Sequence, residues 1–420
     1  MEREIFVSVD LHGTRVLVGR LWCRFRGGRE SATFEYDAGW LEHPERFAID
    51  PALPLTAAAG PFHTVRGVAL FGAMSDSAPD RWGRMLLRRA ARRRARRNDP
   101  APRGLSEADV LLSVDDEARQ GALRFAIEPE GPFLAAPQPS RIPPLVELRR
   151  LVASADRVTG DREDDEDLRL LIGPGSSLGG ARPKAAVRLP DGALAIAKFP
   201  HTEDDRNVVL WEAVALALAE RAGIEAPSRR IQNVGGETVL IVDRFDRRGG
   251  ERIPFLSAMS LVGATDRETH SYLEIADALR QHGARPRQDL AQLWRRIVFN
   301  VLISNTDDHL RNHGFLHEGQ LGWRLSPVYD LNPTPTDVRP RVLSTSIGFD
   351  DPAASLDLAL ETAESYGLEA PTARGIAGEV GAAVAAWKQT AERLGAARRE
   401  TDRLASAFEN EDLVAALAMR

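Results

Sequence analysis

The sequence predicts an α+β protein with more than one domain. At 420 residues the chain is too long for one ordinary hydrophobic core, so two or three domains are expected. Residues 1 to about 50 alternate apolar and polar side chains in short runs, which indicates strands of a small antiparallel sheet. Leu356–Gly367 and Ala373–Met419 are rich in alanine and have apolar residues at helical spacing, so the C-terminal part is expected to be mostly helical.

The composition is typical of a soluble globular protein and narrows the function classes. Hydrophobic residues make up 43% of the chain and charged residues 28%. No window approaches 18 uninterrupted apolar residues, and Met1–Glu4 lacks the order of a signal peptide, so we expect a cytoplasmic protein with no membrane contact. Cys23 is the only cysteine, which excludes an intrachain disulfide and a thiolate zinc site. The net charge of −6 gives no general support for nucleic-acid binding.

A run of arginines ends the first predicted helix. Asp76–Asp80 has the composition of a helix start, and the helix that follows reaches Arg88–Arg97, where seven of the ten residues are arginine. Such a run would suit a nucleic acid or another acidic partner. The alternative is a solvated helix end whose cations offset the helix dipole. We favour this alternative because no aromatic residues interleave to stack on bases.

Two polar stretches follow this helix. Glu128–Pro144 contains six prolines and is expected to be a linker. Asp161–Asp167 holds six acids in seven residues and is expected to be an exposed loop, with metal binding there disfavoured.

A glycine-rich segment, Gly173–Lys184, precedes a predicted hairpin. Glycines with small hydroxyl residues between them let backbone N–H groups approach an anion closely. The hairpin turns at Pro190–Gly192 and returns as the strand Ala193–Phe199. This strand would place Lys198 beneath the loop, where a lysine can meet nucleotide phosphates. The segment matches neither the GxGxxG nor the P-loop pattern, so a flexible surface loop is equally consistent with it.

The next two predicted elements would complete the surroundings of Lys198. Arg206–Gly223 has helical periodicity, and Glu212 within it is expected to form an ion pair with Lys198. Val239–Phe245 has the pattern of a strand that runs into a charged segment, which we interpret as a hinge. On the residues alone, functional and purely structural roles of Glu212 and Asp243 stay equally open.

The most informative stretch begins with the apolar residues of Leu290–Leu302. They have the spacing of one buried helical face, and the helix is expected to end in the polar loop Ser304–Asn312. Phe315–Leu316 and Leu321–Leu325 would then form two short strands joined by a turn. The second strand leads directly to Asp330.

This helix–loop–hairpin would gather Asp307, Asn312 and Asp330 around one point. Phosphoryl transfer needs such a set, with one carboxylate to orient the attacking hydroxyl and hard oxygen ligands for Mg²⁺. A hard ion prefers carboxylate and amide oxygens to imidazole, so His309 is not expected to be a ligand. The alternative is a helix that ends in a capped acidic loop, with Asp330 in an ordinary turn. The order and spacing of all three residues favour phosphoryl transfer.

Motifs spread over nearly the whole chain carry a family resemblance, and they are Phe71–Gly83, Gly121–Phe125, Ser177–Lys184, Ala197–Pro200, Asp243–Asp246, Asn305–Asn312 and Pro327–Asp330. In this order they resemble the HipA family, serine/threonine kinases that act as toxins of bacterial type II toxin–antitoxin pairs. The resemblance implies a two-lobed protein-kinase-like fold with an N-terminal antiparallel-β and helical subdomain and a mostly helical C-terminal lobe. It divides the chain into the N-terminal subdomain (1–127), a Pro-rich linker with an acidic helical segment (128–170), the smaller lobe (171–250) and the C-terminal lobe (251–420).

The resemblance also assigns residue roles and cofactors. By position, Asp307 resembles the family's catalytic acid, and Asn312 and Asp330 resemble its magnesium ligands. The implied nucleotide-binding residues are Lys198, Glu212, Asp243, Phe245 and the loop residues Ser177, Gly179 and Gly180. Arg182 and Lys184 are expected to contact either the phosphates or the phosphoserine. Ser177 stands where the family autophosphorylates, and the adjacent Ser176 leaves the choice of serine open. ATP and Mg²⁺ are the implied cofactors.

Partners and substrate follow from the same resemblance. It implies a separately encoded, HipB-like antitoxin that supplies DNA binding, because no helix-turn-helix pattern is apparent in this chain. The implied substrate is a translation component such as an aminoacyl-tRNA synthetase. Two alternatives stay open: a small-molecule phosphotransferase, and a nucleotide-binding co-repressor subunit of an antitoxin–DNA complex. The N-terminal region argues against the first, and the retained Asp307, Asn312 and Asp330 argue that the second is not the sole role.

Overall fold

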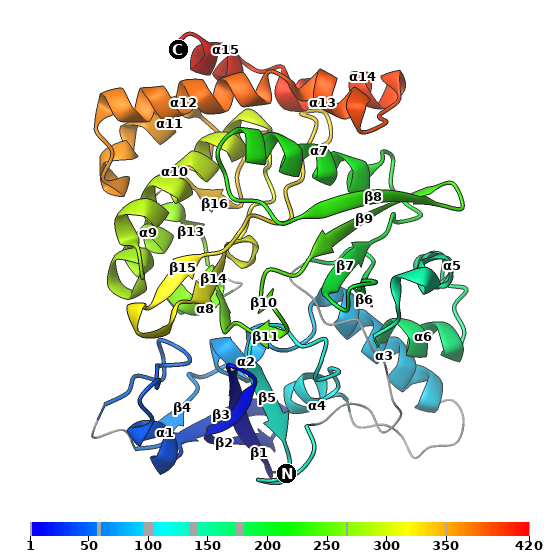
Figure 1. Cartoon of the computed structure of the whole chain (residues 1–420), viewed down its shortest axis with the longest axis vertical. Coiled ribbons are helices and arrows are strands. Elements are labelled where there is room, and N and C mark those ends of the chain that lie inside the picture. Colours follow the sequence, from blue (N-terminus) through cyan, green and yellow to red (C-terminus); the bar gives the residue numbers. More distant parts are fainter. Residues whose placement is uncertain are drawn as a thin grey trace. The chain divides into compact units, whose positions relative to one another are not determined.

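The computed structural model describes residues 2–56, 60–95, 104–133, 142–172, 180–265, 268–349 and 351–419 (Figure 1). The chain divides into two compact units, the first from Met1–Glu203 and Gln232–Leu256 and the second from Asp204–Ile231 and Ser257–Arg420. Strands are concentrated in the first unit and helices in the second, which confirms the predicted α+β class. The four segment boundaries predicted from the sequence stay a prediction.

The first unit begins with a five-stranded antiparallel sheet in the order β4-β3-β2-β1-β5. Its strands are β1 (Glu2–Leu11), β2 (Thr14–Arg26), β3 (Arg29–Tyr36), β4 (Phe62–His63) and β5 (Leu123–Ala126). Alternating apolar runs near residues 5–9 and 16–21 lie in β1 and β2. The antiparallel sheet predicted from this alternation is therefore confirmed.

A second sheet has the order β6-β7-β9-β8, and helices cover one of its faces (Figure 1). Its strands are β6 (Lys184–Arg188), β7 (Leu194–Lys198), β9 (Glu237–Asp243) and β8 (Arg229–Val234). The covering helices are α3 (Arg81–Ala95), α5 (Leu148–Thr159) and α6 (Asp165–Ile172). Apolar side chains of these helices pack with those of β6, β7 and β9 in one buried cluster, so removal of apolar surface from water holds the helices to the sheet.

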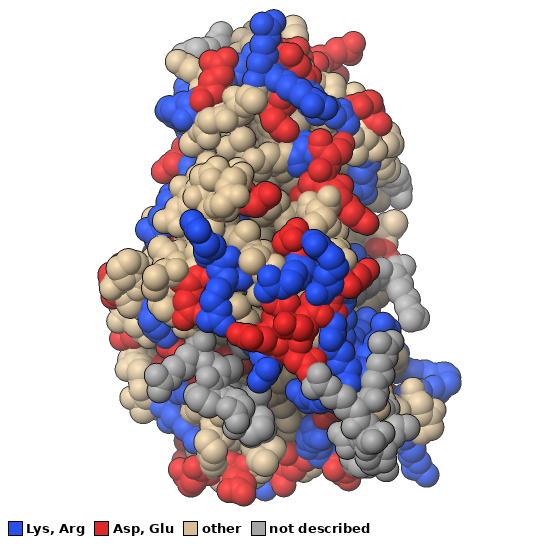
Figure 2. Space-filling view, turned by 90° about the vertical axis from the view of Figure 1, so that its right-hand side faces the viewer, with Lys and Arg blue, Asp and Glu red and all other residues tan. Residues whose placement is uncertain are grey.

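The arginine run on α3 is partly neutralised by the acidic stretch before α6. Arg89 forms ion pairs with Asp161 at 2.7 Å and with Glu163 at 3.0 Å, and Arg93 also contacts Glu163. Figure 2 shows acidic and basic side chains interspersed over one face of the molecule. These pairs favour a structural role for part of the run, while Arg96–Arg97 lie outside the described residues.

The acidic stretch itself is not the exposed loop that its composition predicts. Its second half forms the first turn of α6, where Asp167 is buried. Ser154 Oγ donates a hydrogen bond to Asp167 at 2.7 Å, and Arg157 Nε donates one at 2.8 Å. The hydrogen bonds from Arg157 hold the pKa of Asp167 well below its usual range. The prediction was wrong because the partners lie on α5, a different helix, and local composition does not reveal them.

A buried cluster of charges links β9 to the segment before β5 within the first unit. Asp246 is fully buried and accepts hydrogen bonds from Arg244 Nε (2.8 Å), Arg247 Nη1 (2.8 Å) and the backbone N–H of Gly121 (2.7 Å). Burial opposes ionisation of Asp246, but the two arginines outweigh it and hold the pKa of this carboxyl well below its usual range. The charged segment Asp243–Asp246 therefore has a structural function in addition to any role in ligand binding.

The second unit is mostly helical and packs around α10 (Pro286–Leu302). The helices that contact α10 are α9 (Tyr272–His282), α11 (Leu356–Glu361), α12 (Ala370–Val384) and α15 (Glu411–Leu417). Three more helices belong to this unit: α13 (Trp387–Arg393) and α14 (Arg398–Phe408) continue the row of α12 and α15 at the top of Figure 1, and α7 (Val208–Arg221) lies beneath that row. The predicted helical C-terminal part is confirmed. None of the helices in the described ranges combines the length and apolarity that a membrane span requires.

Short elements connect these parts. They are α1 (Ala38–Glu42), α2 (Gly72–Asp76), α4 (Glu107–Leu112), η1 (Leu145–Glu147), β10 (Arg247–Arg248), β11 (Glu251–Arg252), β12 (Phe255–Ser257), α8 (Ala258–Val262), β13 (His270–Ser271), β16 (Thr345–Ser346) and η4 (Ala363–Tyr366). Of the predicted Pro-rich linker, residues 134–141 lie outside the described ranges.

Candidate functional site

The helix–loop–hairpin predicted around the polar loop is confirmed in the second unit. Helix α10 ends at Leu302, and the chain then turns through Ser304, whose φ of +52° lies in the left-handed region. The 3-10 turn η2 (Leu310–Asn312) leads into the hairpin of β14 (Gly314–His317) and β15 (Trp323–Leu325). One short loop therefore carries Asp307 and Asn312, and one hairpin follows it.

The second strand begins later than predicted. Gly319–Leu321 forms a 3-10 turn (η3), so strand pairing starts at Trp323. Between them Gly322 has a φ of +106°, and a Cβ there would lie 2.5 Å from the carbonyl oxygen of His282. Glycine is therefore required at this position both for its backbone conformation and for the close approach of the neighbouring chain.

Asp307 presents its carboxylate to solvent while its backbone is held by the loop. Its side chain is 63% exposed and forms an ion pair with Arg339 at 3.0 Å. The side-chain amide of Asn312 donates a hydrogen bond to the Asp307 carbonyl oxygen at 3.1 Å. This bond fixes Asp307 and Asn312 relative to each other, as the prediction of one shared site requires.

The Arg339→Ala variant is expected to change the free energy of unfolding by less than about 1 kcal/mol, because exposed ion pairs contribute little. Both side chains of the pair are substantially exposed, at 43% for Arg339 and 63% for Asp307. Urea unfolding of wild type and variant measures the difference. A loss of several kcal/mol would show instead that Arg339 supports the fold of the loop.

Asp308, the neighbour of Asp307, is the structural centre of the loop. It is buried, and its Oδ2 accepts hydrogen bonds from Tyr272 Oη (2.6 Å), Asn300 Nδ2 (2.8 Å) and His313 Nε2 (2.7 Å). Burial opposes ionisation, yet the His313 ring and the other hydrogen bonds outweigh it and keep the pKa of Asp308 below its ordinary value. Two adjacent acids thus have opposite surroundings, one exposed and one buried.

The sequence reasoning missed Asp308, although one signal was present. Asn300 lies on the apolar face of the predicted helix, three residues after Ile297, and a buried amide needs hydrogen-bond partners. The structure supplies them: Asn305 Nδ2 donates to Asn300 Oδ1 at 3.0 Å, and the backbone N–H of Asn332 donates to Asn305 Oδ1 at 3.2 Å. This chain of amides joins α10, the polar loop and the segment after Asp330.

The chain reaches Asp330 in a conformation that few non-glycine residues adopt. Its φ is +60°, and aspartate tolerates this left-handed region better than branched or bulky residues do. The backbone N–H of Asp330 donates to the buried Glu212 Oε1 at 3.2 Å, and Tyr329 Oη donates to the Arg311 carbonyl oxygen at 2.7 Å. Contacts to α7 and η2 therefore hold the Asp330 segment on both sides, in the kind of strained backbone that occurs at functional sites.

The oxygen atoms of this site suit a hard divalent cation. Asn312 Oδ1 is buried and has no hydrogen-bond partner within the described residues, which is costly unless a ligand satisfies it. Mg²⁺ is usually bound by one or two protein oxygens together with phosphate oxygens and water. Asn312 and the carboxylate of Asp330 would provide these protein oxygens.

The predicted lysine lies on the hairpin of the first unit. Lys198 ends β7 and is the register partner of Lys184 at the start of β6, so the hairpin predicted from the sequence is confirmed. Of the glycine-rich loop, Ser176, Ser177 and Gly179 lie outside the described residues, and Gly180 is described with a φ of +100°. The hairpin thus brings Lys198 to the end at which the glycine-rich segment enters β6.

The other predicted nucleotide residues are placed by the structure without a test of their roles. Lys184 is buried and forms an ion pair with Asp80 at 2.7 Å, which links β6 to the segment before α3, and its phosphate contact stays a prediction. Asp243 ends β9, and the Phe245 ring lies 6.4 Å from that of Phe255. The nucleotide contacts of Asp243 and Phe245, and the ion pair between Glu212 and Lys198, stay predictions.

Comparison with known protein families and structures identifies relatives over the whole chain. The HipA-like C-terminal domain matches residues 176–387, and the HipA N-terminal domain matches residues 8–103. A Sinorhizobium fredii protein named "Putative kinase Y4mE" is 26% identical over 330 residues, which cover 71% of each chain. A Haemophilus influenzae protein with the same kinase designation is 24% identical over 184 residues, or 37% of this chain and 52% of that protein.

A solved structure extends the similarity to the complete fold. HipA of Shewanella oneidensis MR-1, determined with HipB and operator DNA, has a TM-score of 0.66 and 17% identity, and the match covers 98% of this chain and 96% of that one. At this level of identity the match shows the fold, a two-lobed kinase-like architecture preceded by an N-terminal subdomain. The family matches, together with the site described above, confirm the family resemblance of the motifs: the chain belongs to the HipA family.

Proposed function

We propose that this protein is an ATP- and Mg²⁺-dependent protein serine/threonine kinase that acts as the toxin of a bacterial toxin–antitoxin pair. One observation carries the proposal: the loop that presents the exposed Asp307 also holds Asn312, whose buried amide oxygen has no hydrogen-bond partner among the described residues. The left-handed backbone of Asp330, in the segment that follows the hairpin, supports the same reading. The kinase names of two relatives support the same activity.

The proposed chemistry divides between positioning and charge neutralisation. Asp307 would accept a hydrogen bond from the substrate hydroxyl, orient it toward the phosphoryl group and take up its proton. Asn312 and Asp330 would hold Mg²⁺, which when bound neutralises phosphate charge. Lys198 would bind nucleotide phosphates, supported by Glu212, while Gly179 and Gly180 would cover them and Asp243 and Phe245 would lie toward the base. Catalysis would then come mainly from preorganisation of charged groups.

The partner and the protein substrate are part of the proposal. The structurally similar Shewanella protein was solved with HipB and operator DNA, which supports a separately encoded, HipB-like antitoxin as partner, with DNA reached only through that complex. A translation component such as an aminoacyl-tRNA synthetase is the proposed substrate. Autophosphorylation of Ser177 or Ser176 would place a doubly charged group where nucleotide phosphates are expected, and like charges would then disfavour ATP binding.

Intact mass of the purified chain before and after incubation with ATP and Mg²⁺ tests the activity. Wild type, starting from unmodified protein, is expected to gain one phosphate, which peptide mapping places on Ser177 or Ser176. The Asp307→Asn variant is expected to gain none and to lose the ability to arrest growth. If wild type gains no phosphate and calorimetry detects no nucleotide binding, or if the folded Asp307→Asn variant still arrests growth, the proposal fails.

A further inference from the structure

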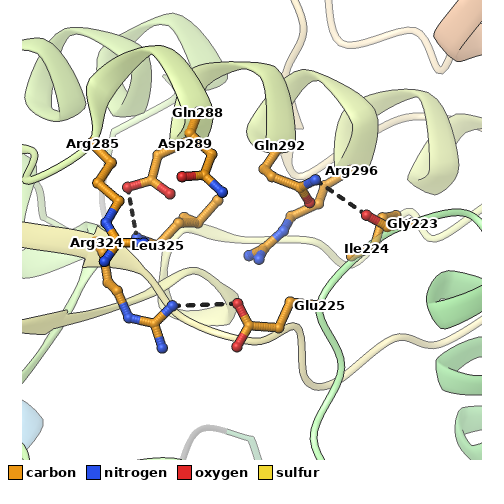
Figure 3. A pocket seen from close by; sticks show the side chains of 10 residues that line it. All are labelled: Gly223, Ile224, Glu225, Arg285, Gln288, Asp289, Gln292, Arg296, Arg324 and Leu325. Atoms are coloured by element: carbon orange, nitrogen blue, oxygen red, sulfur yellow. Dashed lines mark hydrogen bonds and ion pairs between the residues drawn. The ribbon is translucent and has the colours of Figure 1, made fainter.

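The second unit contains a polar cavity that the proposed chemistry does not use. Its volume is about 330 Å³, which lies at the lower end of the range for small-molecule sites. It is formed by the N-terminal half of α10, by β15 and by the segment after α7 (Figure 3). Its polar lining includes Glu225, Arg285, Asp289, Gln292, Arg296 and Arg324.

Arg296 is the most unusual of these residues. It is only 4% exposed, and its guanidinium points from α10 toward Glu225 and Arg324 (Figure 3). One of its nitrogens, Nη2, donates to the Ser326 carbonyl oxygen at 2.6 Å, but Nε has no partner within the described residues. Burial lowers the pKa of Arg296 to about 10, so the side chain remains a cation at neutral pH. A buried cation with an unused donor is costly unless an acceptor completes it.

Cations outnumber acids in the cavity lining, with three arginines (Arg285, Arg296 and Arg324) and two carboxylates (Glu225 and Asp289). Arg324 contacts Glu225 only at 3.4 Å, and Arg285 pairs with Glu318, which lies outside the cavity lining. The cavity runs along the side of α10 (Figure 3), from Arg285, which precedes the helix, to Arg296 in the helix interior.

We propose that this cavity binds the oxyanion group of a small polar metabolite, a carboxylate or a phosphate. Arg296 and Arg324 are its cationic contacts, because both guanidinium groups face the same space (Figure 3). Gln292 donates from Nε2 to the Gly223 carbonyl oxygen at 3.1 Å, while its buried Oε1 has no partner among the described residues. This oxygen is available to a hydroxyl or amino group of the ligand, so the site suits a molecule with one anionic end and one donor.

The cavity residues also hold the strand that leads to Asp330. Asp289 Oδ2 accepts a hydrogen bond from the backbone N–H of Leu325 at 3.2 Å. Arg296 donates a hydrogen bond to the carbonyl oxygen of the following residue, Ser326. The Glu225 carbonyl oxygen accepts from the backbone N–H of Val328 at 2.9 Å. A ligand that orders Arg296 and Glu225 would therefore stabilise residues 325–328, two residues before Asp330.

Thermal unfolding with inorganic phosphate or with glutamate, at ionic strength matched by chloride and without nucleotide or Mg²⁺, tests the site. At least one of the two probes is expected to raise the unfolding temperature with a saturable dependence on concentration, and the probe that does so identifies the oxyanion. The Arg324→Gln variant is expected to bind it about tenfold or more weakly, because it loses a charge-assisted hydrogen bond. Hydrogen exchange at residues 323–330 is expected to slow when the probe binds.

Arg287→Gln is the matched control, since Arg287 also lies on α10 but is exposed and does not line the cavity. It is expected to bind the probe as wild type does, whereas general salt stabilisation would appear equally in all variants. Equal responses of wild type and Arg324→Gln would overturn the inference. The inference also fails if Lys198→Ala abolishes the rise in unfolding temperature with phosphate while Arg324→Gln retains it. Phosphate would then bind at the proposed nucleotide site instead of the cavity. The binding measurement does not depend on kinase activity. A negative result would therefore count against the cavity proposal and not against the proposed function.

Discussion

The Asp308→Ala variant is expected to lose about 3–5 kcal/mol of stability, because it removes the acceptor of three buried hydrogen bonds. Tyr272, Asn300 and His313 all donate to Asp308 Oδ2, and none of them would reach solvent in its place. The pKa of Asp308 is depressed in the folded state, so its contribution is fully present at neutral pH. That contribution is lost only as the pH falls below about 4, the ordinary pKa of an aspartate, and through the depressed folded-state pKa of Asp308.

The adjacent Asp307→Ala variant provides the matched control. Its side chain is exposed, so the free energy of unfolding is expected to stay within about 1 kcal/mol of wild type, while phosphoryl transfer is abolished. Urea unfolding at pH 7 and at pH 3.5 measures both variants, and the gap between wild type and Asp308→Ala is expected to narrow at the lower pH. Equal stability of the two variants at pH 7 would show that Asp308 is not the structural centre of the loop.

The pair Asp307 and Asp308 also shows what could be predicted from the sequence. Apolar spacing over Leu290–Leu302 and turn residues near Glu318–Gln320 are local signals, and they correctly predicted the helix and hairpin that carry the site. The chemistry of oxygen ligands then selected Asp307, Asn312 and Asp330. The different burial of two neighbouring acids depends on tertiary packing, so the spacing of residues gave no indication of it.

Contacts between distant parts of the chain were missed for the same physical reason. The ion pair of Lys184 with Asp80, 104 positions earlier in the chain, was not predicted. The acidic stretch was expected to be an exposed loop, but Glu163 pairs with Arg89 across 74 positions. Composition and periodicity describe which face of an element is apolar, whereas ion pairs between distant elements depend on how those elements pack. The cavity beside Arg296 could not be predicted for the same reason.

The Asp330→Asn variant is expected to slow phosphoryl transfer by about 10³-fold or more while leaving the fold intact. Asparagine tolerates the left-handed backbone at φ +60° as well as aspartate does, so the hydrogen bond from the backbone N–H to Glu212 should persist. Under the proposed function, the variant loses the carboxylate charge that would bind Mg²⁺, and groups that stabilise charge in the transition state are typically worth factors of this size. The loss is therefore expected in the rate rather than in stability.

Initial rates of autophosphorylation across a series of Mg²⁺ concentrations measure this loss, with urea unfolding as the check on folding. Asp337→Asn is the control, because Asp337 lies seven positions later, is exposed and forms an ion pair with Arg403 at 2.8 Å. It carries the same chemical change and is expected to keep the wild-type rate. A rate for Asp330→Asn within tenfold of wild type at every Mg²⁺ concentration would remove Asp330 from the metal site. The left-handed backbone at Asp330 would then need another explanation, because such conformations in non-glycine residues are concentrated at functional sites.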